Sequence, residues 1–372
     1  MKIILAPDSF KDSLSGIDVC SILAEAARRE LGDVEIRCFP MGDGGEGTLD
    51  AVLAATNGRR ETLLVRDPLG RPVEAAYALL PNGEAFVEMA QASGLERLSK
   101  DERNPLLTST YGTGQLILAA LDAGCRKITV GIGGSATTDG GAGMAVALGA
   151  RLVTADGREL DGRGCDLRKI ARVDLAGLDK RLKACVFRVA SDVTNPLCGE
   201  HGAAAVFGPQ KGATPQMVTE LDEGLSHWAE LLVGGEVNAR EKGEVAAGGL
   251  GFGLRILCGA TMTSGAKLVA ELTRLPDAIN GADVVVTGEG RTDEQTLCGK
   301  LPAVVASYAH AHGVRCVLIS GALEGDIRAL RGVFDACFGC VSKVCSLEEA
   351  LRNARQSLSS VAESVFSLLR KG

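Results

Sequence analysis

The chain of 372 residues carries a formal net charge of −7, and it contains 48 glycines but only one Trp, three Tyr and nine Phe. The negative charge argues against a nucleic-acid partner, and the shortage of aromatic side chains argues against base stacking on single strands. Hydrophobic residues make up 46% of the chain, which is enough for a large core and excludes disorder. The glycine excess indicates that backbone atoms form a working surface.

The first 60 residues alternate between strand and helix patterns. Residues 3–6 are a continuous apolar run, as expected for a strand that is buried on both faces. A helix that ends at Gly32, a strand over 34–39, a glycine loop over 42–47 and a helix over 48–58 follow. This βαβα order predicts a parallel sheet.

The pattern changes in the middle of the chain and returns near its end. Turn residues between short apolar runs over 61–90 predict an antiparallel meander. Further on, the sequence predicts a helix near 114–123, a strand over 128–132, a helix within 134–149 and a strand near 186–193. The last part again has α/β rhythm, with strands at 283–287, 314–320 and 334–339, a helix over 302–312 and a terminal helix.

These patterns predict an α/β protein with two domains. Residues 1–60 plus 276–372 would form a three-layer domain around one five-stranded parallel sheet, and residues 61–275 an inserted mixed α/β domain. The cleft between the domains is the expected site. The terminal helix is expected to dock on the sheet, and a homodimer seam along its apolar face is the alternative. No targeting segment and no membrane-spanning run is visible, so we expect a soluble, cytoplasmic protein.

The cysteines do not form a framework. Twelve of them are scattered singly along the chain, between Cys20 and Cys345. A chain of this length needs no disulfide staples, so the pattern predicts reduced, packed thiols.

A glycine-rich segment over 131–149 is the strongest candidate for phosphate binding. Its backbone N–H groups could converge on an anion at the start of a helix, and its hydroxyls could add donors. The candidate ligands for the cofactor's phosphates are Gly133, Gly134, Ser135, Thr137, Gly140 and Gly141. The alternative is a tight turn that binds nothing. Asp139 could bind Mg²⁺ or cap the helix.

Charged residues follow the first two strands. Asp8 could accept a hydroxyl proton, with Ser9 beside it, and Lys11 could neutralise an anion; helix capping by Asp8 or Ser9 is the alternative. The loop over 42–47 matches G-x-G-x-x-G, but its carboxylates would repel a pyrophosphate. Asp43 therefore suits a metal or a ligand that carries hydroxyl groups.

Two later segments complete the set of candidates. Asp192 and Asn195 stand at a strand end where active-site residues project, and an Asx-turn is the alternative for Asp192. Lys211 could hold a phosphate or carboxylate, or be a solvated loop lysine. The loop after the strand at 283–287 alternates in charge and fits a metal–phosphate pair or a surface salt-bridge loop. Its candidates are Glu289, Arg291, Asp293 and Lys300.

Glycine loops, strand-end carboxylates and a few cations are together the set that phosphoryl transfer uses. An NAD(P)-dependent hydroxy-acid oxidoreductase is a second hypothesis, although the first strand lacks a glycine fingerprint. A non-enzymatic sensor of small anions is a third, although it would not need so many carboxylates.

The sequence resembles the bacterial glycerate kinase family. The matching stretches are APDSFKDSLS, GDGGEGT, GIGGSATTDGGAGM, SDVTNPLCGEHGAA, FGPQKGA, AAGGLGFGL and VVTGEGRTDEQTLCGK. The resemblance spans essentially the whole chain and implies ATP, Mg²⁺, D-glycerate as acceptor and phosphoglycerate as product, with 2-phosphoglycerate favoured over 3-phosphoglycerate. It also implies a flavodoxin-like domain that is interrupted by a second α/β domain. Gly42 stands where the family often has Ala, which touches no charged residue.

These observations combine into one hypothesis of in-line transfer of the ATP γ-phosphoryl group to a glycerate hydroxyl. Asp8 or Asp192 would be the base, with Lys11 nearby. The phosphates would bind Gly133, Gly134, Ser135 and Thr137, and Mg²⁺ would bind two of the residues Asp43, Asp139, Asp192, Glu289 and Asp293. The glycerate carboxylate or the moving phosphoryl group would pair with Arg291, Lys211 or Lys300.

Overall fold

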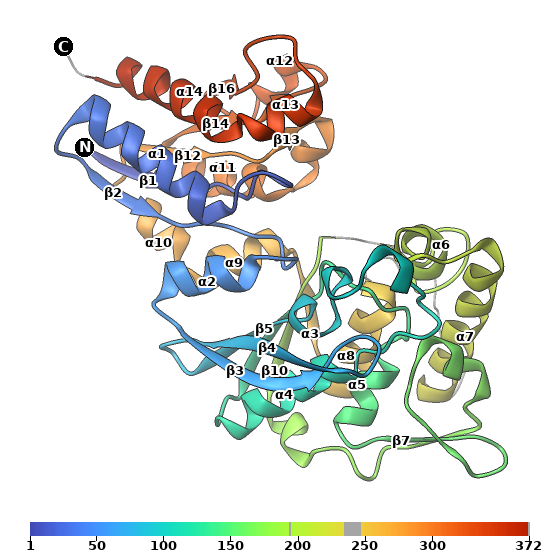
Figure 1. The fold of residues 1–372 in the computed structure, drawn as a ribbon. Coiled ribbons are helices and arrows are strands. Elements are labelled where there is room, and N and C mark those ends of the chain that lie inside the picture. The colour runs from blue at the N-terminus through green and yellow to red at the C-terminus, as the bar shows by residue number, and fades with distance from the viewer. Residues whose placement is uncertain (193–194, 234–246, 371–372) are drawn as a thin grey trace. The chain divides into compact units, whose positions relative to one another are not determined.

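The computed structural model describes residues 1–192, 195–233 and 247–370, which divide into two compact units (Figure 1). Unit 1 contains residues 1–43, 50–57 and those from 266 onward, and unit 2 contains residues 44–49 and 58–265. Val193, Thr194 and Ala246, which belong to two of the motifs quoted above, lie outside the described residues. The predicted domain boundaries at 60, 61, 275 and 276 stay a prediction.

Unit 1 is built on a parallel sheet of five strands. In space the strands run in the order β16-β14-β12-β1-β2, which is 2-1-3-4-5 in chain order when counted from the β2 edge. This is the doubly wound order of flavodoxin-like sheets. The predicted α/β class and parallel sheet are therefore confirmed. The strands are β1 (Lys2–Leu5), β2 (Glu35–Cys38), β12 (Val284–Thr287), β14 (Arg315–Ser320) and β16 (Ala336–Gly339).

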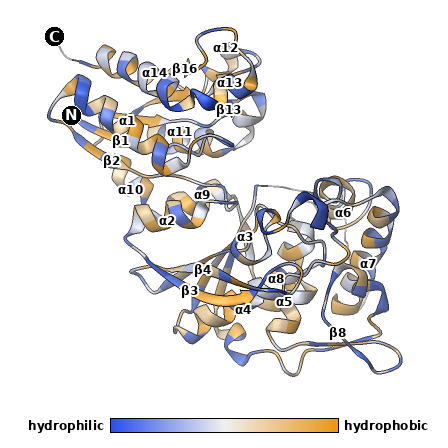
Figure 2. Ribbon diagram, viewed as in Figure 1, coloured by the Kyte–Doolittle hydropathy of each residue, from blue (hydrophilic) through white to orange (hydrophobic). Residues whose placement is uncertain are grey.

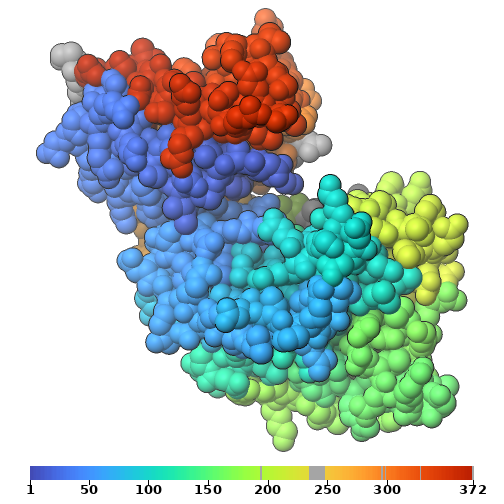
Figure 3. Space-filling view, viewed as in Figure 1, coloured from blue at the N-terminus to red at the C-terminus, as the bar shows by residue number. Residues whose placement is uncertain are grey.

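Helices cover this sheet because its central strands are apolar on both faces. Ile3, Ile4 and Leu5 of β1 are fully buried, and β1 pairs in parallel register with both β2 and β12. Helices α1 (Gly16–Leu31) and α14 (Ala354–Leu368) pack together in one core cluster with the sheet. In Figure 3 the N-terminal residues and the red C-terminal residues accordingly lie against each other.

The remaining elements of unit 1 connect these strands. They are α2 (Thr48–Thr56), α9 (Gly265–Leu272), α10 (Leu275–Ile279), β13 (Arg291–Thr292), η7 (Glu294–Cys298), α11 (Leu301–Ala311), β15 (Ala322–Leu323), α12 (Ile327–Leu330) and α13 (Leu347–Arg352). The C-terminal segment forms two helices, because Asn353 between α13 and α14 leaves the helical conformation. Leu358, Ala362, Val365 and Phe366 of α14 are buried in the core cluster of unit 1, so this helix docks on the sheet as predicted, whereas Leu368 at its end is 76% exposed.

Unit 2 contains a mixed sheet of six strands in the order β11-β10-β6-β5-β4-β3. The first four of these are parallel, and β5-β4-β3 are antiparallel, which confirms the predicted meander. The strands are β3 (Arg59–Arg66), β4 (Pro72–Leu79), β5 (Glu84–Glu88), β6 (Lys127–Gly131), β10 (Val186–Ala190) and β11 (Thr261–Thr263).

Several helices and a small sheet complete unit 2. Its helices are α3 (Ala90–Ser93), η1 (Leu95–Arg97), η2 (Lys100–Glu102), α4 (Tyr111–Asp122), α5 (Ala142–Ala147), η3 (Gly164–Lys169), η4 (Lys180–Ala184), α6 (Ala203–Phe207), η5 (Pro209–Lys211), α7 (Pro215–Val233), η6 (Ala247–Gly249) and α8 (Leu250–Cys258). A sheet that the sequence did not predict contains β7 (Arg151–Val153), β8 (Glu159–Leu160) and β9 (Arg172–Asp174).

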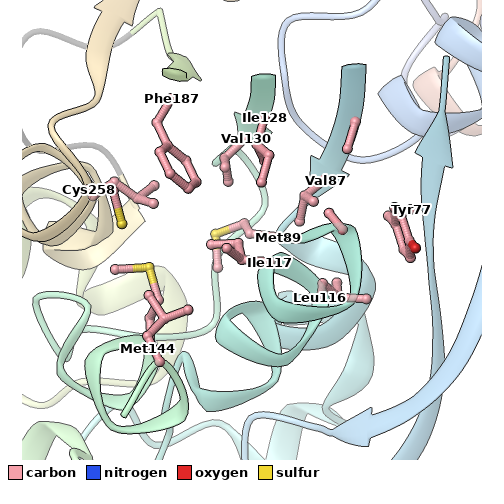
Figure 4. Packing of buried hydrophobic residues seen from close by; sticks show 14 of the residues in the cluster. Tyr77, Val87, Met89, Leu116, Ile117, Ile128, Val130, Met144, Phe187 and Cys258 are labelled. Atoms are coloured by element: carbon pink, nitrogen blue, oxygen red, sulfur yellow. The ribbon is translucent and has the colours of Figure 1, made fainter. Parts of the chain in front are cut away.

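The core of unit 2 lies between its sheet and helices α4, α5 and α8. Figure 4 shows Val87 and Val130 from neighbouring strands facing Leu116 and Ile117 of α4. Burial of such side chains contributes about 1.5–3 kcal/mol each. Figure 2 shows hydrophobic and hydrophilic residues alternating along the helices of both units, as expected for helices with one buried face. Among the described residues, no helix is both long and apolar enough to cross a membrane.

The helix predicted within 134–149 is much shorter than the sequence indicates. Only Ala142–Ala147 are helical, because Gly140 and Gly141 adopt positive φ angles of 62° and 79°. A right-handed helix cannot contain these conformations. The glycine segment is therefore a long loop, followed by a helix of six residues.

Candidate active site

Carboxylates gather at the carboxyl edge of the sheet in unit 1. Asp8 follows β1, Asp43 follows β2 and Glu289 follows β12. The Asp8 N–H donates to the Gly288 carbonyl oxygen at 2.8 Å, which ties the first loop to the third. In doubly wound sheets, ligands bind at this edge because the loops there diverge. The structure thus brings three predicted residues together in unit 1.

Asp8 is the titratable group with the most unusual environment in this cluster. Burial, followed by the charges of Asp43 and Glu289, raises its pKa from 3.8 to about 7, although hydrogen bonds from Ser9 oppose the shift. The main-chain N–H of Ser9 donates to Asp8 Oδ1 at 2.6 Å. A carboxyl group with a pKa near 7 can exchange protons at neutral pH, which is the property that a general base requires.

Two threonines hold Glu289. Thr292 Oγ1 and Thr296 Oγ1 donate to the same oxygen, Oε1, at 2.9 and 2.7 Å. The hydroxyls of Thr292 and Ser320 lie 2.5 Å apart. Because Thr292 uses its hydroxyl hydrogen for Glu289, its oxygen accepts the hydrogen bond that the Ser320 hydroxyl donates. Burial raises the pKa of Glu289, and the two threonine hydrogen bonds oppose that shift.

The charged loop after β12 contributes one cation to the same edge. Lys300 Nζ lies 3.6 Å from Asp293 Oδ1, and both side chains are part-exposed. The charges of Lys300 and Asp293 also act on Glu289. Arg291 points elsewhere, since it pairs with the exposed carboxylate of Glu324 at 2.7 Å. Lys11 and Ser9 are exposed.

In unit 2, the two glycine loops of the sequence pack against each other. The Gly133 N–H donates to the Gly44 carbonyl oxygen at 3.1 Å. Gly44 has a φ of 91°, and a Cβ there would lie 2.8 Å from the Ala190 carbonyl oxygen, so only glycine fits. A Cβ at Gly134 would lie 2.9 Å from Glu46 Oε1. The loops at 44–47 and 131–134 therefore share one edge with the end of β10.

Most of the predicted phosphate-binding amides are already used inside unit 2. The N–H groups of Gly133, Thr137, Gly140 and Gly141 donate to Gly44 O, Ser135 Oγ, Gly248 O and Asp139 Oδ1, respectively. Ser135 and Thr137 hydrogen-bond with each other at 3.1 Å and are buried. The helix that follows also begins later than predicted and has only six residues, so its dipole contributes little to anion binding. The exposed part of this loop is Gly134 with its neighbour Gly133.

Asp139 organises the same loop from within. It is fully buried, and Oδ2 accepts from the N–H and hydroxyl of Thr110, both at 2.7 Å, and from the Gly143 N–H at 3.2 Å. Burial raises its pKa, whereas these hydrogen bonds oppose the shift. This bonding favours the capping alternative over a metal-binding role for Asp139.

Lys211 is also enclosed, with only 2% of its surface exposed. Its Nζ donates to the Thr137 carbonyl oxygen at 2.5 Å and lies 3.5 Å from Ser135 Oγ. Burial lowers its pKa from 10.5 to about 7, although the charge of Asp139 opposes the shift. The alternative of a solvated loop lysine is wrong, because the η5 segment inserts this side chain beneath the glycine loop.

The segment after β10 places its two candidates in local contacts. Asp192 is exposed, and its Oδ1 accepts from the Gly265 N–H at 2.9 Å. Asn195 Nδ2 donates to the His201 carbonyl oxygen at 3.1 Å. Both side chains therefore stabilise their loops, and Asp192 keeps part of its carboxylate in solvent.

Magnesium fits the residue types at the unit 1 edge. Within the described residues, no group of three or more His, Cys, Asp or Glu side chains is arranged to enclose a metal ion. Mg²⁺ bound with a nucleotide usually needs only one or two carboxylates, because phosphates and water supply its other ligands. Glu289 and Asp293 offer such oxygen donors side by side, whereas Asp139 is occupied by its amide partners.

Several residues of the site were not predicted from the sequence. Thr292, Thr296 and Ser320 support Glu289, and Glu88 Oε2 accepts the Leu49 N–H at 2.7 Å next to the glycine loops. The two threonines lie three and seven residues after Glu289, so a search for hydroxyls that could reach a strand-end carboxylate would have found them. Ser320 and Glu88 come from distant parts of the chain and give no such signal.

Together, the doubly wound sheet and its acidic edge define an α/β protein with the ligand-binding geometry of many enzymes. The model of the glycerate kinase family matches residues 3–370. A glycerate 2-kinase of Escherichia coli K12 is 43% identical over 100% of this chain and 99% of its own. A glycerate kinase of Halalkalibacterium halodurans is 44% identical over 98% and 97%.

Structural comparison agrees with the sequence comparison. A crystal structure assigned to glycerate kinase 2 of Salmonella typhimurium LT2 is similar with a TM-score of 0.87 and 45% identity, covering 99% of this chain and 98% of that one. The chain belongs to the glycerate kinase family, and it is accordingly an enzyme of the kinase class.

Proposed function

We propose that the protein transfers the γ-phosphoryl group of ATP to the 2-hydroxyl of D-glycerate. Family membership supports glycerate as acceptor and ATP as donor. The 2-position is supported by the Escherichia coli relative, which is named a glycerate 2-kinase. The single observation that carries the mechanism is the carboxyl group of Asp8, whose pKa of about 7 suits a base for the attacking hydroxyl.

In this proposal, Asp8 takes the hydroxyl proton of glycerate as the oxygen attacks phosphorus. Burial, followed by the charges of Asp43 and Glu289, raises the pKa of Asp8, so its carboxylate takes up a proton more readily. The main-chain N–H of Ser9 orients the Asp8 carboxylate through its hydrogen bond to Asp8 Oδ1. Positioning of this kind supplies much of the rate in phosphoryl transfer, which needs little covalent chemistry from the protein.

Glu289 and Asp293 would hold Mg²⁺, which when bound neutralises charge on the β- and γ-phosphates. Thr292 and Thr296 keep the Glu289 carboxylate oriented and favour its ionised form. Lys300, which lies beside Asp293 at the same edge, would pair with the glycerate carboxylate or the moving phosphoryl group. Arg291 is paired with Glu324, and Lys211 is enclosed.

The glycine loops of unit 2 would contact the nucleotide through the exposed Gly133–Gly134 turn. Asp139 and Lys211 would then act as positioning residues, because they hold the loop from within. Asp192 stays a second candidate for the base or for a metal ligand. The expectation that the reaction takes place in a cleft between two domains stays a prediction.

A coupled assay of ADP release tests this function. Purified enzyme is supplied with MgATP and a panel of D-glycerate, L-glycerate, lactate and tartronate. We expect turnover with D-glycerate at a kcat/KM at least tenfold above that of the other acids, about 1.4 kcal/mol of discrimination. Reduction of NAD(P)⁺ by the same acids without ATP consumption would favour the oxidoreductase, and tight anion binding without turnover would favour the sensor.

A further inference from the structure

Two cysteines that lie apart in the sequence meet in unit 1. Cys20 is in α1 and only 3% exposed, whereas Cys38 is the last residue of β2 and exposed. In the parallel pairing of β1 with β2, Cys38 is the register partner of Leu5, the residue whose carbonyl oxygen Cys20 contacts. Cys20 Sγ also lies 3.8 Å from the Leu5 carbonyl oxygen. Both thiols are free in the structure, so they form a reduced pair with one buried and one accessible member.

The surroundings of the two thiols shift their pKa values in opposite directions. The neighbouring Cys20 thiol, followed by the charge of Arg28, lowers the pKa of Cys38, although burial opposes the shift. The interaction with Cys38, together with burial, raises the pKa of Cys20. An accessible thiolate beside a second thiol is the arrangement in which the first sulfur attacks an oxidant and the second resolves the product.

Three buried cysteines have a different environment. Burial raises the pKa of Cys125, Cys258 and Cys340, and all three are largely enclosed. Cys345 is part-exposed in a loop and serves as the comparison thiol.

We propose that Cys20 and Cys38 are a modification site at which a peroxide produces an intramolecular disulfide. The Cys38 thiolate attacks one oxygen of hydrogen peroxide, the O–O bond breaks, and the sulfenic acid of Cys38 forms with release of water. The Cys20 sulfur then attacks this sulfenic sulfur and displaces a second water. In total, two thiols lose two electrons and two protons, and one peroxide becomes two waters.

The pair lies next to the candidate active site within the same unit. Cys38 precedes Asp43 by five residues, and Leu5, which Cys20 contacts, precedes Asp8 by three. A disulfide would link the end of β2 directly to α1. The modification site is nevertheless independent of the proposed function, because its formation is measured on the thiols themselves.

Peptide mapping tests the proposal directly. The full-length enzyme is treated with hydrogen peroxide at low protein concentration, alkylated under denaturing conditions and digested with trypsin without reduction. Cleavage after Lys11, Arg28, Arg37 and Arg59 places the two cysteines in peptides 12–28 and 38–59. We expect these peptides to be joined and two hydrogens lighter than their sum, and Cys38 to react with peroxide at least about tenfold faster than Cys345.

Three variants separate the roles of the thiols. Cys38→Ala should abolish the linked peptide and leave Cys20 reduced. Cys20→Ala should abolish it too, but leave Cys38 as a sulfenic acid that dimedone traps. Cys345→Ser, the matched control, should leave the yield of linked peptide within about twofold. The proposal is overturned if wild-type Cys38 oxidises without the linked peptide, or if Cys20 is oxidised equally fast in Cys38→Ala.

Discussion

Replacement of Asp8 by Asn should make the protein more stable at alkaline pH and nearly inactive. The substitution keeps the shape of the side chain but removes its titration. In the wild-type protein, the pKa of Asp8 rises from 3.8 to about 7 on folding, so the folded state holds more protons than the unfolded state between these values. The contribution of Asp8 to the free energy of unfolding therefore falls as the pH rises through this window. Asn does not titrate, so the variant does not lose this stability.

The size of the effect follows from the shift. Between pH 5 and pH 8 a group with these two pKa values loses about 2–3 kcal/mol of folding free energy. Because Asp8 is only part-buried, solvent screening reduces this to about 1–3 kcal/mol. The stability difference between Asp8→Asn and wild type should thus grow by this amount from pH 5 to pH 8. Loss of the base should lower kcat/KM about 10²–10⁴-fold.

Denaturant unfolding at several pH values, together with steady-state kinetics, measures both effects. Asp12→Asn is the matched control, since Asp12 is an exposed carboxylate in the same loop. It should follow the wild-type pH dependence of stability. A stability difference for Asp8→Asn that does not change with pH would show that Asp8 has no raised pKa. A kcat/KM within about threefold of wild type, which is under ~0.7 kcal/mol, would show that Asp8 is not the base.

Three other substitutions test neighbouring parts of the account. Asp43→Asn removes a charge that raises the pKa of Asp8. The acidic limb of the pH profile of kcat/KM should therefore move to lower pH. A limb that does not move would mean that its pKa belongs to a group other than Asp8. Gly44→Ala should lower the unfolding free energy about 1–3 kcal/mol more than Gly47→Ala in denaturant melts, because both have positive φ but only Gly44 lacks room for a Cβ. Equal losses would show that close packing there is unimportant. Lys211→Met should cost about 1–3 kcal/mol in the same melts, because a buried carbonyl loses its donor; no loss would place this lysine in solvent.

The sequence was sufficient for the architecture of the parallel sheet. Apolar runs such as residues 3–6 and 284–286 are buried on both faces, and strict alternation with helices leaves few ways to order the strands. It was insufficient for the length of α5, because the conformations of Gly140 and Gly141 depend on packing against distant segments. Short strands such as those of β7 to β9 carry too little pattern to be recognised.

For the candidate site, the sequence predicted which carboxylates stand at strand ends. It did not predict their burial, their hydrogen-bond partners or the direction of their pKa shifts. Asp8 and Asp139 are both Asp in glycine- or serine-rich loops, yet one faces other carboxylates and the other is enclosed by amides. That difference comes from tertiary contacts, to which local sequence gives no access. The same reason explains why the sequence left Lys211 open between an anion ligand and a solvated lysine, and why it did not predict that Cys20 and Cys38 are neighbours.

The central claim is phosphorylation of glycerate, and the structure of the product tests it most directly. Enzyme, MgATP and D-glycerate are incubated to completion, and the product is examined by ¹H–³¹P correlation spectroscopy. We expect one phosphoglycerate per ADP, with phosphorus coupled to the single proton on C2. Coupling to the two protons on C3 would contradict the proposed 2-position, and ADP formation without any phosphoglycerate would contradict the proposed function itself.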